Sequence, residues 1–110
     1  SGIFTFPATG IWHIISVITH IEGDSAVQYA TNRIATTTNN SAYSDAATSY
    51  NSPATAGAYT TTSANFIFDV TDTSTHKVRL STNANDTSTS TMGDSDRNRT
   101  SITFIRLGDT

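Results

Sequence analysis

Two segments near the ends of the chain constrain its fold most, because each predicts a β-strand with apolar side chains on both faces: residues 10–21 and 101–107. Alternate side chains of a strand point to opposite faces. One face of the first segment carries Trp12, Ile14 and Ile18, and the other carries Ile11, His13, Ile15, Val17, Thr19 and Ile21. A small antiparallel sheet usually buries one face and exposes the other. Strands that are apolar on both faces indicate a sheet covered on both sides, by a second sheet and by other subunits.

The composition favours strands over helices throughout the chain. Serine and threonine make up about a third of the residues, and the hydrophobic residues, 35% of the total, are concentrated in a few runs. Thr, Val, Ile, Phe and Tyr favour strands, whereas Ser, Asn and Asp favour turns. No segment shows a long apolar recurrence at helical spacing, so the sequence predicts an all-β protein.

The length and the turn signals predict one domain over residues 1–110. We expect strands at residues 3–6, 10–21, 26–37, 43–50, 58–71 (one strand or two), 76–80 and 100–107, with one more short strand in the polar segment 83–99. Short strands separated by turns are typical of a two-sheet antiparallel sandwich, here of about eight to ten strands. Because the sequence starts with Ser1 rather than methionine, we expect it to be the C-terminal piece of a longer protein.

Several classes of function are disfavoured. A net charge of −3 and a single lysine argue against nucleic-acid binding, which calls for a clustered basic surface. No apolar run is long enough to span a membrane, so we expect no membrane insertion. Without cysteine there is neither a disulfide nor a Cys-ligated metal. No nucleophile elbow, phosphate-binding glycine loop or zinc-protease motif is present, and we expect the protein not to be an enzyme.

The order of the motifs carries a family resemblance. The relevant segments are Gly2–Pro7, Gly10–Ile14, Phe66–Val70, His76–Leu80, Asn85–Asp86, Met92–Gly93 and Ser101–Leu107. Together they resemble the globular heads of complement component one q and, more broadly, the jelly rolls of the tumour necrosis factor superfamily. The segments 69–78 and 100–109 look most like versions of this head found at the C-terminus of virion or tail-associated proteins of marine bacteriophages. The resemblance implies a two-sheet jelly roll, a tight homotrimer and a role in recognition.

The resemblance also places the first long strand and the last strand in the sheet nearest the three-fold axis. That agrees with the apolar pattern on both of their faces, and we expect a subunit interface formed by Ile11, His13, Ile15, Val17, Thr19 and Ile21. The alternative is that an N-terminal segment or a loop of the same chain covers these residues. Trp12 shares its face with Ile14 and Ile18, so we expect it in the core rather than at an exposed ligand platform.

Two sets of residues are candidates for metal binding. His13 and His20 have opposite parity on one strand and cannot converge on one ion. Asp94, Asp96 and Asn98 alternate as hard oxygen ligands for calcium do, and related heads often bind calcium. The pattern then fails, because Arg99 and Ile105 stand where a helix-loop-helix calcium site needs Gly and Glu. We expect a solvated loop and no cofactor, with calcium at Asp94 and Asp96 as the alternative.

These expectations describe an extracellular module on a virion surface. The head would trimerise a bacteriophage fibre, spike or other surface protein, and its loops Asn39–Tyr50 and Asn83–Arg99 would contact a host-surface glycan or protein. Polar loops on a rigid scaffold suit that task. The alternative is a capsid decoration or assembly domain with no ligand of its own.

Overall fold

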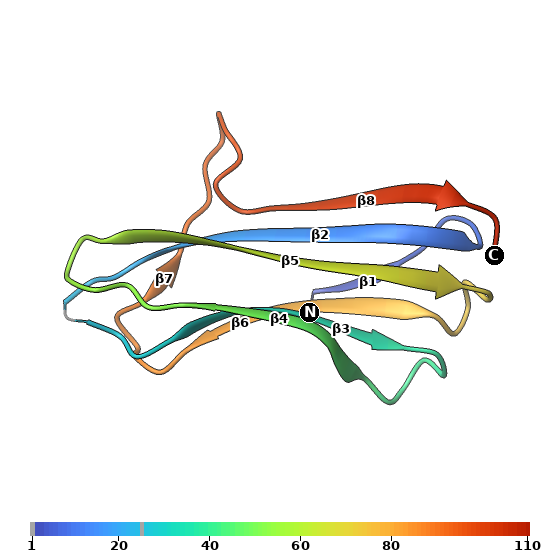
Figure 1. The fold of residues 1–110 in the computed structure, drawn as a ribbon, viewed down its shortest axis with the longest axis horizontal. Coiled ribbons are helices and arrows are strands. Elements are labelled where there is room, and N and C mark those ends of the chain that lie inside the picture. The colour runs from blue at the N-terminus through green and yellow to red at the C-terminus, as the bar shows by residue number, and fades with distance from the viewer. Residues whose placement is uncertain (1, 25) are drawn as a thin grey trace.

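The computed structural model describes residues 2–24 and 26–110, which form strands and no helix (Figure 1). None of these residues belongs to a helix that is long and apolar enough to cross a membrane. The strands in this part of the chain are β1 Ile3–Thr5, β2 Gly10–Ile21, β3 Ala30–Thr37, β4 Ser44–Asn51, β5 Tyr59–Val70, β6 Lys77–Ala84, β7 Ser90–Thr91 and β8 Ser101–Gly108. The all-β prediction is confirmed.

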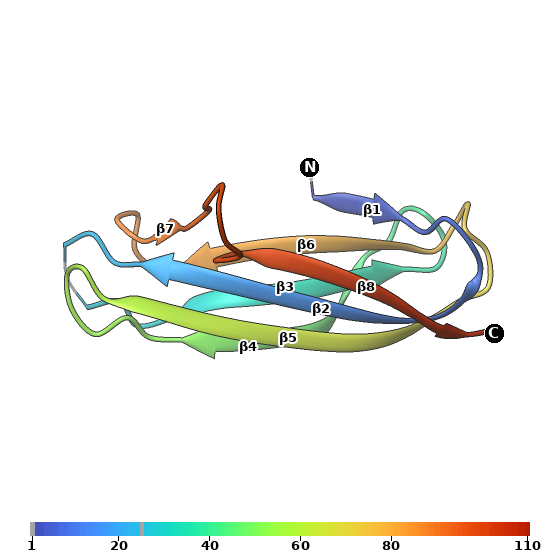
Figure 2. The same cartoon turned by 90° about the horizontal axis from the view of Figure 1, so that it is seen from above.

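The strands form two antiparallel sheets that pack face to face as a sandwich (Figure 2). One sheet has the order β1-β6-β3-β4. In the other, β2 lies between β5 and β8, and β7 pairs with the last residues of β2. Most consecutive strands lie in different sheets, as in a jelly roll. The expected two-sheet sandwich is therefore confirmed.

The core is built by the inward face of each long strand. Trp12 and Ile14 of β2 pack with Phe68 and Val70 of β5, and the second sheet contributes residues such as Ile34. Phe6, which follows β1, contacts several core rings, with its centroid 5.4 Å from Trp12 and 5.9 Å from Phe68. Burying a side chain of this size is worth about 1.5–3 kcal/mol. Trp12 is a core residue, as expected, and its indole N–H donates to Ala8 O at 3.2 Å.

A buried polar contact ties the two sheets together. Asn32 of β3 is fully buried, accepts a hydrogen bond from Ser16 Oγ of β2 at 2.8 Å, and donates to Ser16 O at 2.7 Å. Its amide also lies 3.3 Å from Thr62 O of β5. Because a buried amide must be satisfied, these bonds favour one relative placement of the sheets.

Gly10, the first residue of β2, fits a position that other residues would strain. Its φ is 146°, and a Cβ there would lie 2.6 Å from Gly108 O. The register between β2 and β8 shifts at the adjacent Ile11 and Trp12. The glycine therefore allows the close approach of the first and last long strands at this end of the sheet.

Two expected strands differ from the observed ones. β3 starts at Ala30 rather than at residue 26, because the N–H groups of Gln28 and Tyr29 donate to Asn85 Oδ1 instead of to a neighbouring strand. β6 continues to Ala84, into the segment expected to be a loop. For residues 58–71, where one strand or two were expected, the structure has the single strand β5.

Candidate functional site

The six residues predicted to form an interface share the outward face of β2. Their side chains are half-buried, in strict alternation with the buried residues that face the second sheet. β5 and β8 flank β2 along most of its length, so this face lies at the centre of its sheet. Figure 2 looks onto the face, with β8, β2 and β5 in front of the other sheet.

Apolar side chains on the flanking strands widen the patch at one end. His13 lies directly between Ile67 of β5 and Ile105 of β8, which are 57% and 43% exposed. Leu107, 55% exposed, extends it beside Ile11. We call the outer-face patch the set Ile11, His13, Ile15, Val17, Thr19, Ile21, Ile67, Ile105 and Leu107. Towards its other end, the small polar residues Ser63 and Ser101 lie opposite Val17, and Tyr59, which is 61% exposed, lies opposite Ile21.

The outer-face patch has almost no charge. Asp69, opposite Ile11, is the one formally charged residue among the outward-facing residues of β2, β5 and β8 in the described chain. His13 Nε2 lies 3.1 Å from Asn65 Oδ1, so the ring donates a hydrogen bond within the face. Interface cores are depleted of charged residues in this way.

The chain's own segments cover little of the patch. The N-terminal residues from Ile3 to Thr5 pair with β6 in the opposite sheet, so this segment does not cover the patch. The loop between β7 and β8 contacts only one end, where Thr19 Oγ1 donates to Arg99 O at 2.6 Å and Thr19 N donates to Thr100 Oγ1 at 3.3 Å. In Figure 1 this loop projects beyond the outer face of the sheet.

The calcium candidates lie in that projecting loop. The Asp94 carboxylate contacts Arg99 Nε at 2.9 Å and Arg97 Nε at 3.3 Å. It also accepts from Asp96 N at 2.9 Å, and this backbone bond together with Arg99 lowers the pKa of Asp94. Because two guanidinium groups already neutralise it, the geometry favours the solvated loop over a cation at Asp94 and Asp96. The alternating oxygens in the sequence did not reveal these arginine contacts.

The histidines lie apart, as their parity required. His13 points outward from β2, His20 points into the sandwich, and His76 stacks on Phe68 beside the turn between β5 and β6. Among residues 2–24 and 26–110, the only group of three potential metal-ligating side chains is Glu22, Asp24 and Asp86.

That acidic cluster was not predicted from the sequence. Glu22 follows β2 and is 1% exposed, and the hydroxyl of Ser88 donates to its carboxylate. Ser88 Oγ also lies 2.8 Å from Asp24 Oδ1 and 2.9 Å from Asp86 Oδ1. Hydrogen bonds from Ser88 and then Thr89 lower the pKa of Glu22 to about 2. Glu22 therefore stays ionised and fastens the loop between β6 and β7 to the end of β2.

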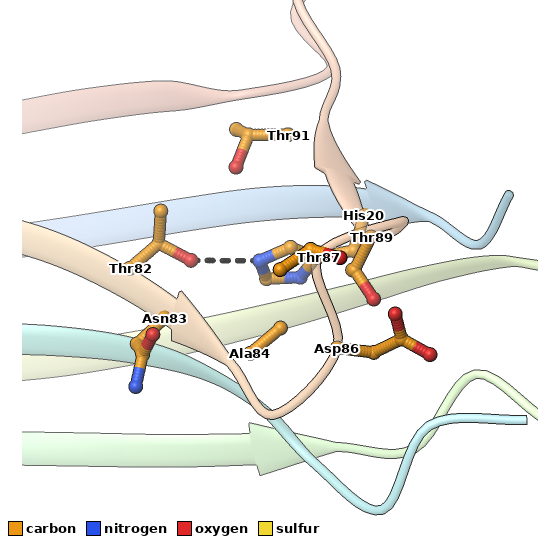
Figure 3. Close-up of a pocket in the computed structure, with 8 residues that line it drawn as sticks. All are labelled: His20, Thr82, Asn83, Ala84, Asp86, Thr87, Thr89 and Thr91. Atoms are coloured by element: carbon orange, nitrogen blue, oxygen red, sulfur yellow. Dashed lines mark hydrogen bonds between the residues drawn. The ribbon is translucent and has the colours of Figure 1, made fainter.

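A polar pocket adjoins this cluster at the same end of the sandwich (Figure 3). Its volume is about 280 Å³. The lining residues come from the end of β2, the end of β6, the β6–β7 loop and β7, and they are His20, Thr82, Asn83, Ala84, Asp86, Thr87, Thr89 and Thr91.

His20 forms a fixed, neutral wall of the pocket. The Thr82 hydroxyl donates to Thr31 O at 2.7 Å, so its 2.8 Å contact with His20 Nε2 requires the ring to donate. His20 Nδ1 is then the acceptor for Asn51 Nδ2 at 3.4 Å. Burial lowers the pKa of His20, which agrees with a neutral ring. Both ring nitrogens are therefore engaged within the fold.

The two loops expected to act together lie at opposite ends of the molecule. β3 and β6 are antiparallel, with Thr37 opposite Lys77 and Ala30 opposite Ala84. The turn after Thr37 and the loop after Ala84 are therefore separated by the length of the sandwich (Figure 1). Part of the first expected loop is strand β4, and the second contains β7.

No family model matches the chain, and no curated protein matches it. The candidate sites therefore depend on geometry alone. They are the outer-face patch on one sheet and the polar pocket with its acidic cluster at the end of β2.

The acidic cluster predicts a specific acid sensitivity. Because the pKa of Glu22 falls from 4.5 to about 2 on folding, its contribution to stability is complete above pH 4.5 and is lost as the pH falls towards 2. We expect Glu22→Gln to lower the melting temperature at neutral pH, and this deficit to shrink between pH 4.5 and 2. Circular dichroism melts over pH 2–7 measure it, with Asp96→Asn as a control that removes one exposed negative charge away from the Glu22 cluster. A deficit that stays constant over this pH range would contradict the assignment.

Proposed function

We propose that this chain is the homotrimeric head of a bacteriophage structural protein, located on a fibre, a spike or the virion surface, and that it serves host-surface recognition. The outer-face patch carries the proposal of self-association. The trimeric state, the virion location and the likeness to complement and tumour necrosis factor heads rest on the sequence resemblance.

The energetics of the outer-face patch support association. Each isoleucine or leucine moved from water into a packed interface contributes about 1.5–3 kcal/mol. Ile67, Ile105 and Leu107 are about half exposed in the single chain, beside the half-buried residues of β2. Contiguous apolar surface of this kind marks interaction sites in soluble proteins.

A second copy is the best partner for this surface. With Asp69 as its one formally charged residue, the face offers almost no charge for a strongly acidic or basic partner. Homo-oligomeric interfaces are the more apolar class, and closed cyclic symmetry lets every copy bury the same patch. The projecting β7–β8 loop then lies at the rim of the contact, where it limits how neighbouring copies approach.

We assign the recognition role to the end of the sandwich that carries the β6–β7 loop, which lies outside the outer-face patch. The two candidate loops cannot form one tip, since they lie at opposite ends. The β6–β7 loop is the stronger candidate, because it borders the polar pocket and is held in place by Glu22.

Replacing one central residue of the patch tests self-association. We expect wild-type protein to sediment as a trimer and Ile15→Asp to yield monomer, because a buried, unpaired carboxylate costs several kcal/mol. Ile105→Asp, at a more exposed position on β8, gives the same test with less risk to folding. The matched control is Ile3→Asp, since Ile3 is 44% exposed on the opposite sheet. Multi-angle light scattering that shows an intact trimer in folded Ile15→Asp and Ile105→Asp would contradict the proposal.

Binding to host cells tests recognition separately. We expect the isolated trimer to adsorb to cells of the parent phage's host and to slow phage adsorption in competition, because a recognition head carries its binding surface with it. Cell binding is measured with fluorescently labelled protein, and competition is measured as the rate of phage adsorption with and without the trimer. A domain that is incorporated into virions yet neither binds cells nor competes would instead be a decoration or assembly domain.

A further inference from the structure

We propose that the polar pocket at the end of β2 binds one ring of a neutral saccharide. This inference rests on the recognition role proposed above, and it names the site and the ligand class for that role. The pocket of about 280 Å³ lies at the lower limit of the usual range for ligand sites, which suits one sugar ring better than an extended ligand.

The residue types that line the pocket disfavour several classes of ligand. No lysine or arginine lines the pocket, while Asp86 does, with Glu22 and Asp24 close by. An anionic ligand such as a phosphate or a sialic acid would meet repulsion without a compensating cation. The lining offers no Phe, Tyr or Trp ring on which a nucleobase could stack, and Ala84 is its one apolar residue, so lipid is also disfavoured.

The hydrogen-bonding groups of the pocket match those of a sugar. Hydroxyl groups of a saccharide both donate and accept, and so do threonine hydroxyls. Thr87 and Thr91 line the pocket and are exposed, so their hydroxyls can reach a bound ligand. In Figure 3 the Thr91 hydroxyl points towards the pair formed by His20 and Thr82.

Hydrogen bonds within the protein fix the lining side chains, so the pocket is formed in the absence of a ligand. Thr82 is fixed between His20 and Thr31 O, and the Thr89 hydroxyl donates to Glu22 Oε2 at 2.7 Å. Ser88 N donates to Asp86 Oδ1 at 2.9 Å, which closes the turn of the loop. A pre-formed site loses little conformational entropy on binding. The neutral His20 adds no charge that would favour an anion.

Saturation-transfer NMR with defined sugars tests the inference. Glucose, galactose, mannose and N-acetylglucosamine are offered at millimolar concentration to the wild-type chain, with N-acetylneuraminic acid and calcium chloride in separate samples. We expect transfer to at least one neutral sugar, and affinity about tenfold weaker in Thr87→Val and in Thr91→Val, since each loses one hydrogen bond. Thr9→Val, at the opposite end of β2, is the matched control and should bind as wild type does.

Several outcomes would overturn the inference. These are no transfer to any neutral sugar, transfer unchanged in both valine variants, and calcium perturbing the His20 and Thr91 resonances where no sugar does. Sedimentation of the same samples separates this result from the assembly proposal. A trimer that binds no sugar refutes the pocket alone, whereas a monomer that binds sugar refutes the assembly alone.

Discussion

Alternation of side chains along β2 is the constraint on which the rest of the structure depends. The twelve residues of this strand give one face to the core and the other to the outer-face patch, with no break from Gly10 to Ile21. A shift of one residue in its pairing would exchange the two faces, placing His13 and Thr19 in the core and Trp12 in solvent. Pairing on both sides, with β5 along the full strand and β8 along most of it, holds this register.

The same strand links the surface proposed for assembly to the pocket proposed for recognition. Its outward residues form the middle of the outer-face patch, its penultimate residue His20 forms a wall of the polar pocket, and Glu22 follows directly. Glu22 fastens the β6–β7 loop through Ser88 and Thr89, so the loop's position follows from where β2 ends. Copies that associate through the patch would therefore present their pockets in a fixed arrangement, which allows several weak contacts to act together.

Features that depend on local pattern were predictable from the sequence. The strand periodicity of residues 10–21 identified the core position of Trp12. The alternation of Phe66, Phe68 and Val70 is a local pattern of the same kind, and these residues lie on the inner face of β5. The opposite orientations of His13 and His20 followed from parity alone.

Features that depend on contacts between distant residues were not predictable. Asn85 sets the start of β3, because its Oδ1 accepts hydrogen bonds from the N–H groups of Gln28 and Tyr29, which would otherwise pair with a neighbouring strand. The acidic cluster joins Glu22 to Ser88. The one sequence signal that could have suggested it is the position of the sole glutamate directly after an apolar strand. The spacing of Asp94 and Asp96 suggested calcium, but the pattern of oxygens did not show that Arg97 and Arg99 fold back onto the carboxylate.

The solvent exposure of individual isoleucine methyl groups tests the central claim most directly. NMR relaxation by a soluble paramagnetic agent reports it for each residue in the assembled protein. If neighbouring copies cover the outer-face patch, the methyl groups of Ile15, Ile67 and Ile105 will be as protected as those of core Ile14. Relaxation of these methyl groups as fast as that of exposed Ile3 would contradict it, because the patch would then be in contact with water.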